Sequence, residues 1–391
     1  MNEWLFVFVL LLPIAWYFGY RKGSTEQPKN TNSIQSALSK PYFAGLNYLL
    51  NEQQDKAIDS FASMLEVNSD TADIQLALGN LYRKRGEVDR SIRIHQNLIA
   101  RPSLASTDKN LALLELGYDY MAAGLLDRAE NIFHELSGDL THHEVCIQQL
   151  LAIYQLTNEW NKAIQMAAKL QTPLSEANSI KLSHFYCELA QDSLKKSEHG
   201  VAKKFIKKAH QTSSNCVRAT LLHAELHMSI GEYKKALKGY REIILQDITF
   251  LPEAIAPIVN CYSHLDNKIE LEKYLQEVIK KGGGTSVILA YAEILQVKSG
   301  AAVASKFIAA QLEKQPSLKG VLRLIELQVE STQDSGESSL LVLNKVVSKL
   351  LEDKPVYHCS YCGFDSKSLF WQCPGCKSWG SVKPIIGIEG E

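Results

Sequence analysis

The spacing of small and bulky residues within Leu113–Leu136 constrains the fold of this chain more than any other feature. Gly117 and Ala129 are small enough for two antiparallel helices to approach each other closely, and Phe133 is large enough to fill the space beside them. Gly124 lies between them, where the chain has to reverse. The pattern therefore predicts a helical hairpin.

The same spacing recurs on both sides of this hairpin, in steps close to about 34 residues, the period of tetratricopeptide repeats. At the position of Ala129 the other hairpins carry Ala57, Ser91, Ala163, Ala202, Ala236 and Ala304. The interval from Ala236 to Ala304 spans two periods, so we expect a degenerate repeat near Glu270–Leu275. The chain resembles the tetratricopeptide repeat family, and we predict an all-α tetratricopeptide-repeat solenoid over residues 41–353.

Length and charge narrow the class of protein further. With 391 residues the chain is too long for one compact core unless that core is stacked as repeats. Its 42 basic and 43 acidic residues leave a formal net charge of -1, so we expect no nucleic-acid partner. The sequence contains no glycine-rich phosphate loop, no H-E-x-x-H and no G-x-S-x-G motif. We therefore predict a protein that is not an enzyme, with no catalytic or cofactor-binding residues.

The start of the chain reads as a membrane anchor. Trp4–Tyr20 is an uncharged apolar run that is followed at once by Arg21 and Lys22. Its length is at the short end of what crosses a bilayer as a helix. The alternative is a cleaved signal peptide, but in those the positive charges precede the apolar run. We predict a transmembrane anchor over residues 1–22. Because positive residues are enriched on the cytoplasmic side of a membrane helix, Arg21 and Lys22 place the rest of the chain on that side.

Two further segments follow from composition. Residues 23–40 are polar and show no sustained apolar period, so we expect a linker that holds the first repeat near the membrane. At the other end, an amphipathic helix is expected over Leu340–Leu351. It leads into residues 354–391, which are predicted to form a separate small domain, called the knuckle below.

The eight cysteines fall into two groups. Four are scattered singly through helical segments and are expected to be buried small residues: Cys146, Cys187, Cys216 and Cys261. The other four form two C-x-x-C pairs, which we predict to bind one metal ion: Cys359, Cys362, Cys373 and Cys376. Each pair can fold as a tight turn, and two such turns close a tetrahedron around the ion. Gly363 and Gly375 are expected to take the positive φ angles that these turns need.

Four thiolates suit either iron or zinc, so the spacing predicts one iron or zinc ion without choosing between them. Two disulfides or a redox dithiol are the alternative, but a reducing cytoplasm disfavours them. Because protein ligands fill all four positions, no water can be bound for hydrolysis. We expect a structural site or, as the second option, a one-electron redox centre.

The knuckle has more large side chains than so small a module can cover: Tyr357, Tyr361, Phe364, Leu369, Phe370, Trp371 and Trp379. We expect some of them to pack on the metal turns. The surplus is expected to dock on the last helices of the solenoid or, as the alternative, on a partner protein.

The order of anchor, repeats and four-cysteine tail resembles the lipopolysaccharide assembly protein B family of the bacterial inner membrane. The resemblance rests on this order and on Cys359-Ser-Tyr-Cys362-Gly with Cys373-Pro-Gly-Cys376, which look like a rubredoxin-type or zinc-ribbon motif. The family's metal ligands correspond to these four cysteines.

The resemblance implies a membrane-tethered adaptor of the cell inner membrane that limits lipopolysaccharide (lipid A) synthesis. The implied partners are a membrane-anchored ATP-dependent zinc metalloprotease and the lipid A pathway deacetylase, whose degradation the adaptor promotes. A second copy of the chain, in a homodimer, is a further candidate partner. Two alternatives stay open from the residues alone: a redox protein with an iron knuckle, and a general scaffold for envelope-assembly enzymes.

Overall fold

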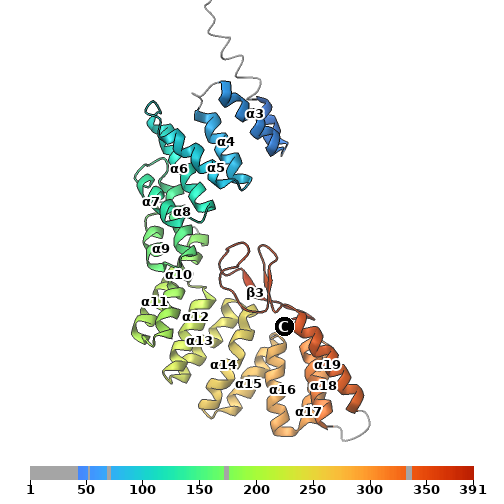
Figure 1. The fold of residues 1–391 in the computed structure, drawn as a ribbon. Helices are drawn as coiled ribbons and strands as arrows, with labels where there is room; N and C mark the ends of the chain where they lie inside the picture. The colour runs from blue at the N-terminus through green and yellow to red at the C-terminus, as the bar shows by residue number, and fades with distance from the viewer. Residues whose placement is uncertain (1–42, 52, 68–71, 171–175, 332–336) are drawn as a thin grey trace, which may run out of the picture. The chain divides into compact units, whose positions relative to one another are not determined.

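The computed structural model of the chain describes residues 43–51, 53–67, 72–170, 176–331 and 337–391 (Figure 1). The predicted anchor Trp4–Tyr20 and the predicted linker 23–40 lie outside these residues. Among the described helices, none is both long enough and apolar enough to cross a lipid bilayer.

The chain divides into two compact units, Met1–Leu150 and Leu151–Glu391, called unit 1 and unit 2. In unit 1 the helices from α3 to α7 pack mainly on their neighbours along the chain, as in stacked hairpins. Its described helices are a segment over 43–50, α3 (Gln54–Val67), α4 (Ala72–Lys84), α5 (Val88–Ile99), α6 (Ser106–Ala122), α7 (Leu126–Leu136) and the start of α8 (His143–Leu156).

Unit 2 continues the pattern of helices that pack on their neighbours and ends in the knuckle. The helices are α9 (Trp160–Ala167), α10 (Glu176–Lys195), α11 (His199–Thr212), α12 (Val217–Ser229), α13 (Tyr233–Gln246), η1 (Ile248–Phe250), α14 (Leu251–His264), α15 (Lys268–Lys280), α16 (Thr285–Ser299), α17 (Ala301–Leu312), α18 (Leu318–Ser331) and α19 (Glu337–Asp353). The last helix is longer at both ends than the predicted Leu340–Leu351.

Close helix approach at glycine is confirmed in unit 1. A Cβ atom added at Gly117 would lie 2.6 Å from the ring of Phe133, so α6 and α7 can pack as they do only with glycine there. Two earlier hairpins repeat the arrangement, and the pairs are Gly45 with Phe61 and Gly79 with His95. Gly124 has a φ of +73° where the chain reverses between α6 and α7, as predicted.

The predicted repeat register is also confirmed. The small residues assigned to one position of each hairpin are all 0% exposed: Ala57, Ser91, Ala129, Ala163, Ala202, Ala236 and Ala304. The degenerate repeat expected near Glu270–Leu275 is the hairpin of α14 and α15, in which Leu271 and Leu275 replace the small residue as buried contacts. These helices are thus a tetratricopeptide-type scaffold.

A buried polar network in unit 1 was missed by the sequence analysis. Asp119 on α6 is fully buried, and its carboxylate accepts a hydrogen bond from Ser91 at 2.6 Å and one from Arg83 at 2.8 Å. Its other oxygen lies 2.6 Å from Nδ1 of His95, which occupies the place of Phe133 in this hairpin. Because the partners come from α4 and α5, the carboxylate ties three helices together.

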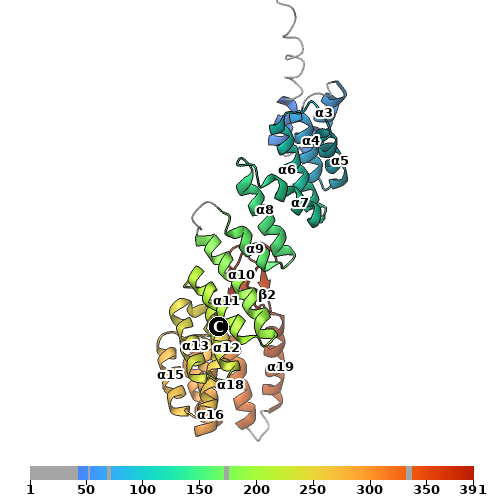
Figure 2. The same cartoon turned by 90° about the vertical axis from the view of Figure 1, so that its left-hand side faces the viewer.

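The knuckle is a small antiparallel sheet with strand order β2-β1-β3. Its strands are β1 (Tyr357–Cys359), β2 (Asp365–Ser366) and β3 (Val382–Pro384). In both views of the molecule these strands lie beside the middle helices of unit 2. The knuckle therefore does not extend the stack of helices past α19 (Figures 1 and 2).

Candidate metal centre and its docking surface

The structure brings the four tail cysteines together, with their sulfur atoms all within 4.8 Å of one another. The Sγ atoms of Cys359 and Cys376 are 3.8 Å apart, and those of Cys362 and Cys373 are 3.6 Å apart. An ion with metal–sulfur bonds of about 2.3 Å in a tetrahedron separates its sulfur ligands by about 3.8 Å. A disulfide needs about 2.05 Å. The spacing therefore fits four ligands of one metal ion and not two disulfide bonds.

Each C-x-x-C pair closes a tight turn, in which the amide of the residue after the pair donates to the carbonyl of the first cysteine. These bonds are 3.0 Å for Gly363 and 2.9 Å for Lys377. The φ angle is +78° at Gly363 and +60° at Lys377, so the prediction for Gly363 is confirmed. The prediction for Gly375 is wrong, because the left-handed position is the one after the second cysteine. Gly375 lies close to sulfur instead: a Cβ there would be 3.5 Å from Sγ of Cys362.

Hydrogen-bond donors favour the thiolate form at two of the four sulfur atoms, those of Cys359 and Cys376. At Cys362 a backbone hydrogen bond from Phe364 lowers the pKa, but burial and the other three cysteines outweigh it and raise the pKa to about 12. Burial raises the pKa of Cys359, but a hydrogen bond between its sulfur and the Ser381 hydroxyl and hydrogen bonds from two backbone amides of the first turn outweigh burial and lower the pKa to about 6. The hydroxyl and the amide of Ser378 lower the pKa of Cys376. Since the thiolate is the form that binds metal, the turns prepare these sulfurs as ligands.

The four cysteines form a candidate metal site that suits iron and zinc equally, because both ions accept four thiolates in a tetrahedron. The site leaves no coordination position for a reacting water. The ion would cross-link the two turns. The fully buried part of the knuckle is otherwise only Cys359, Cys373 and Val382, so the metal replaces a core that the module lacks.

Trp379 carries the main contact between the knuckle and the repeats. Its indole N–H donates to Oε1 of Gln155 on α8 over 3.0 Å, and its ring stacks on His184 of α10 with centroids 5.1 Å apart. Trp160 and Phe185 meet the same ring edge-on at 6.0 Å and 5.8 Å. The pKa of His184 is lowered to about 3, first by burial and then by a nearby arginine, so the stacked imidazole is neutral.

A second aromatic contact lies further along the solenoid. Trp371 stacks on Phe250 of η1 with centroids 5.4 Å apart and an angle of 17° between the ring planes. The guanidinium of Arg218, on α12, lies over the same indole at 5.7 Å from the ring centroid. Together the two tryptophans fix the knuckle on residues that span α8 to η1.

Polar contacts surround these rings. Tyr357 donates to Glu253 of α14 over 2.6 Å, and the ammonium of Lys383 lies 2.7 Å from the carboxylate of Asp247. The carboxylate of Glu391 accepts from Ser286 of α16 at 2.8 Å. Lys319 of α18 donates to the same carboxylate over 2.7 Å.

The expected docking on the scaffold is confirmed, but its expected place, the last helices, is wrong. The tryptophans of the knuckle pack on α8 to α12 and η1, and only the final residues contact α16 and α18. The difference arises because the spatial arrangement of the repeats, and not proximity in sequence, decides which helices the knuckle contacts. Tyr361 is 80% exposed and Phe370 is 38% exposed, so these two aromatics are left for other contacts.

The scattered cysteines are all buried, as predicted, but two of them are not isolated. Cys187 on α10 donates a hydrogen bond to Cys216 at the start of α12. This bond is the main reason that the pKa of Cys216 is lowered to about 6. Burial, in contrast, raises the pKa of Cys187. Cys216 also lines a pocket of about 240 Å³ between the knuckle and the repeats.

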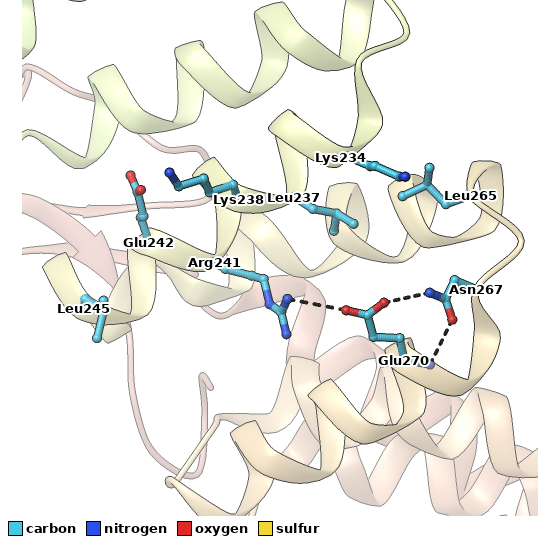
Figure 3. A pocket seen from close by; sticks show the side chains of 9 residues that line it. All are labelled: Lys234, Leu237, Lys238, Arg241, Glu242, Leu245, Leu265, Asn267 and Glu270. Carbon is cyan, nitrogen blue, oxygen red and sulfur yellow. Dashed lines mark hydrogen bonds and ion pairs between the residues drawn. The ribbon is translucent and has the colours of Figure 1, made fainter.

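A wider depression of about 630 Å³ lies on the repeats between α13 and the start of α15 (Figure 3). Arg241 faces Glu270 across it at 3.8 Å, and the side chain of Asn267 hydrogen bonds to Glu270. Its lining consists of leucines, lysines, Glu242 and these paired polar groups, with no cysteine, serine or histidine.

Known protein families match the knuckle and one segment of the repeats. The rubredoxin metal binding domain family matches residues 357–384, and the tetratricopeptide repeat family matches residues 76–105. The first match covers the four candidate ligands.

Two curated relatives align over their whole length. The lipopolysaccharide assembly protein B of Escherichia coli strain K12 is 37% identical over 391 residues, with 100% of both chains covered. The protein of the same name from Haemophilus influenzae is 37% identical over 398 residues, again with 100% of both covered.

A solved structure, the C-terminal part of a repeat protein from Cytophaga hutchinsonii, is 18% identical. It covers 69% of this chain and 94% of that one, with a TM-score of 0.38.

Proposed function

The chain belongs to the lipopolysaccharide assembly protein B family, and from this premise we propose that it is a membrane-tethered adaptor that limits lipopolysaccharide synthesis. The names of the full-length relatives support a role in lipopolysaccharide assembly. Because those relatives are named as assembly proteins and the repeats form a scaffold, the chain is not an enzyme.

In the proposed mechanism the repeats hold the deacetylase of the lipid A pathway while a membrane-anchored ATP-dependent zinc metalloprotease degrades it. The physical basis is effective concentration. A soluble deacetylase meets a protease in the bilayer rarely, whereas a short tether can keep a bound client near it at a local concentration approaching ~mM. Residues 1–22 are the proposed anchor in the inner membrane, residues 23–40 are the proposed tether, and the repeats lie in the cytoplasm.

The docked knuckle is the observation that most supports an adaptor whose parts act together. Trp379 and Trp371 pack on repeats from α8 to η1, so the metal site and the client-binding scaffold share one surface. Loss of the metal would unfold the knuckle and expose His184, Phe185 and Phe250. We propose that the metal has this structural role and that its loss removes adaptor function even when the anchor is intact.

A pulse-chase measurement of the deacetylase tests the proposal in cells depleted of the native protein. Wild-type protein should restore a short half-life, and Lys109→Ala, an exposed change on the repeats, should do the same. Cys373→Ser should leave the half-life long. A protein without residues 1–20 should bind the deacetylase but shorten its half-life less than the wild type does.

An unchanged half-life in the depleted strain would overturn the adaptor mechanism. Co-purification from membranes, with and without the knuckle, identifies the partners independently. Recovery of neither the protease nor the deacetylase with the intact chain would contradict the proposed partners.

A further inference from the structure

Unit 2 contains a pair of histidines that take no part in the metal knuckle. His223 and His227 lie one turn apart on α12, and their Nε2 atoms are 3.2 Å from each other. Their ring centroids are 4.6 Å apart, and the ring planes meet at 85°. This H-A-E-L-H segment was not predicted to bind a metal.

The inclination of the rings matters because it sets where the nitrogen lone pairs point. Two rings joined head to head by a straight hydrogen bond would have centroids separated by the nitrogen distance plus both ring radii. The observed centroids are closer than that, so the two rings are inclined to each other and are not joined by a straight head-to-head hydrogen bond. A zinc-type ion with metal–nitrogen bonds of about 2.0–2.1 Å holds two such nitrogens about 3.3 Å apart. The pair already has that spacing.

The second ring nitrogen of His227 is held in the manner of a metal ligand. Its Nδ1 lies 2.6 Å from Oε2 of Glu232, and Lys235 fixes the other carboxylate oxygen at 2.7 Å. A carboxylate behind a ligating histidine sets the ring orientation and raises its basicity toward the ion. Glu232 thereby keeps Nε2 of His227 free to face His223.

A third histidine lies near the pair on the preceding helix. The rings of His210, on α11, and His223 have centroids 6.3 Å apart. Among the described residues, the tail cysteines are the group in which three or more ligand atoms lie within 4.8 Å. The site as it stands therefore offers two ligands, with water or a rotated His210 completing the shell.

The electrostatic setting favours the neutral imidazole at His223 and His210. Burial is the main cause that lowers the pKa of His223 to about 4, and the nearby His227, His210 and Lys203 add to it. Burial also lowers the pKa of His210, although Glu242 opposes the shift. Neutral imidazole is the form that binds metal, so these two histidines need not lose a proton to bind an ion near neutral pH.

We propose that His223 and His227 form a second metal site, for a divalent transition-metal ion of the class that prefers imidazole, such as Zn²⁺, Ni²⁺ or Cu²⁺. Glu232 positions the site, and His210 is the candidate third ligand. An ion held by all three histidines would join α11 to α12. This site is independent of the four-cysteine centre and of the adaptor mechanism.

Equilibrium dialysis of the full chain in detergent, without a polyhistidine tag, tests the site with Ni²⁺ as the probe. Elemental analysis then counts nickel separately from the iron or zinc retained by the knuckle. We expect one Ni²⁺ per chain, lost in His223→Ala and kept in His264→Ala, which changes an exposed histidine elsewhere in unit 2. Cys373→Ser should lose the knuckle metal and keep the nickel.

His223 is only half-buried, so its replacement leaves the core filled, and circular dichroism checks that the helices persist. Glu232→Gln retains both ligands and should weaken Ni²⁺ binding by about 10–100-fold. Absence of bound nickel in the wild type, or full retention in a folded His223→Ala protein, would overturn the proposal and leave a histidine–histidine hydrogen bond. Loss of nickel from Cys373→Ser alone would assign the ion to the knuckle and equally refute the second site.

Discussion

The α6–α7 hairpin and the knuckle are stabilised in different ways. In the hairpin, Gly117 lets the ring of Phe133 approach the backbone of α6, and the buried Ala129 lies on the same helix as that ring. In the knuckle, the buried core is little more than two cysteines and Val382, and four sulfur atoms take the place of side-chain packing.

This difference determines how each region fails. A repeat packs against the hairpins on either side of it, so one unfavourable contact removes only a part of the free energy of unfolding of the array. The knuckle has one centre on which every turn depends, so loss of a single ligand removes the whole module. A second dependence runs from the knuckle to the repeats, because its tryptophans cover part of their surface.

Cys373→Ser should have the largest effect, and that effect should be confined to the knuckle. The hydroxyl leaves an incomplete tetrahedron, and structural metal binding to such small modules contributes on the order of 10 kcal/mol of apparent folding free energy. We expect loss of the metal and rapid proteolysis from Val356 onward, with the repeats still helical. Elemental analysis and limited proteolysis with mass spectrometry measure both, and Ser360→Ala is the matched control. One metal per chain in both proteins would contradict the four-ligand site.

Trp379→Ala should weaken the docking of the knuckle on the repeats without removing the metal. Replacing this tryptophan removes its ring contacts and its bond to Gln155, at a cost of about 3–5 kcal/mol to the docked state. The metal should stay bound, while hydrogen exchange around His184 should become faster. Tyr361→Ala, at an exposed aromatic of the same module, should change neither quantity. If Trp379→Ala also releases the metal, docking and metal binding are one event.

Gly117→Leu should have a smaller effect that is confined to the repeats. The new side chain collides with Phe133 and forces α6 and α7 apart, which costs about 1–3 kcal/mol or more as overpacking does. Thermal unfolding of the full chain should show a lower midpoint, with the knuckle metal retained. Lys109→Ala, on the exposed side of α6, is the control. Equal midpoints for the two variants would show that the helices do not need to approach at this glycine.

Lys383→Ala should have the smallest effect, because its partner Asp247 and the lysine itself are both partly exposed. Such ion pairs contribute roughly 0–1 kcal/mol, and salt weakens them further. Burial alone would raise the pKa of Asp247, but Lys383 and Thr249 lower it below its ordinary value of 3.8.

The sign of this shift fixes the pH dependence. A carboxylate with a lowered pKa contributes stability above its unfolded pKa and loses it only as the pH falls through the folded value. The difference in urea midpoint between wild type and Lys383→Ala should therefore stay constant between about pH 5 and 8 and shrink in high salt. A difference that changes steeply across that pH range would assign the effect to another group.

Much of both regions could be predicted from the sequence, because their signals are local. The recurrence of small residues from Ala57 to Ala304 predicts the hairpins, since helix period and close approach are set by residues a few turns apart. The two C-x-x-C pairs predict the candidate site for a similar reason: two short turns are enough to place four sulfurs around one ion.

The tertiary structure decided what depends on residues distant in the chain. The seat of Trp379 on Gln155 and His184 depends on the path of many stacked helices, each adding a small rotation that no single repeat encodes. Asp119, with its partners on two other helices, looked like an ordinary helical residue for the same reason. Local patterns determine which elements form, whereas contacts between distant elements depend on geometry accumulated along the whole solenoid.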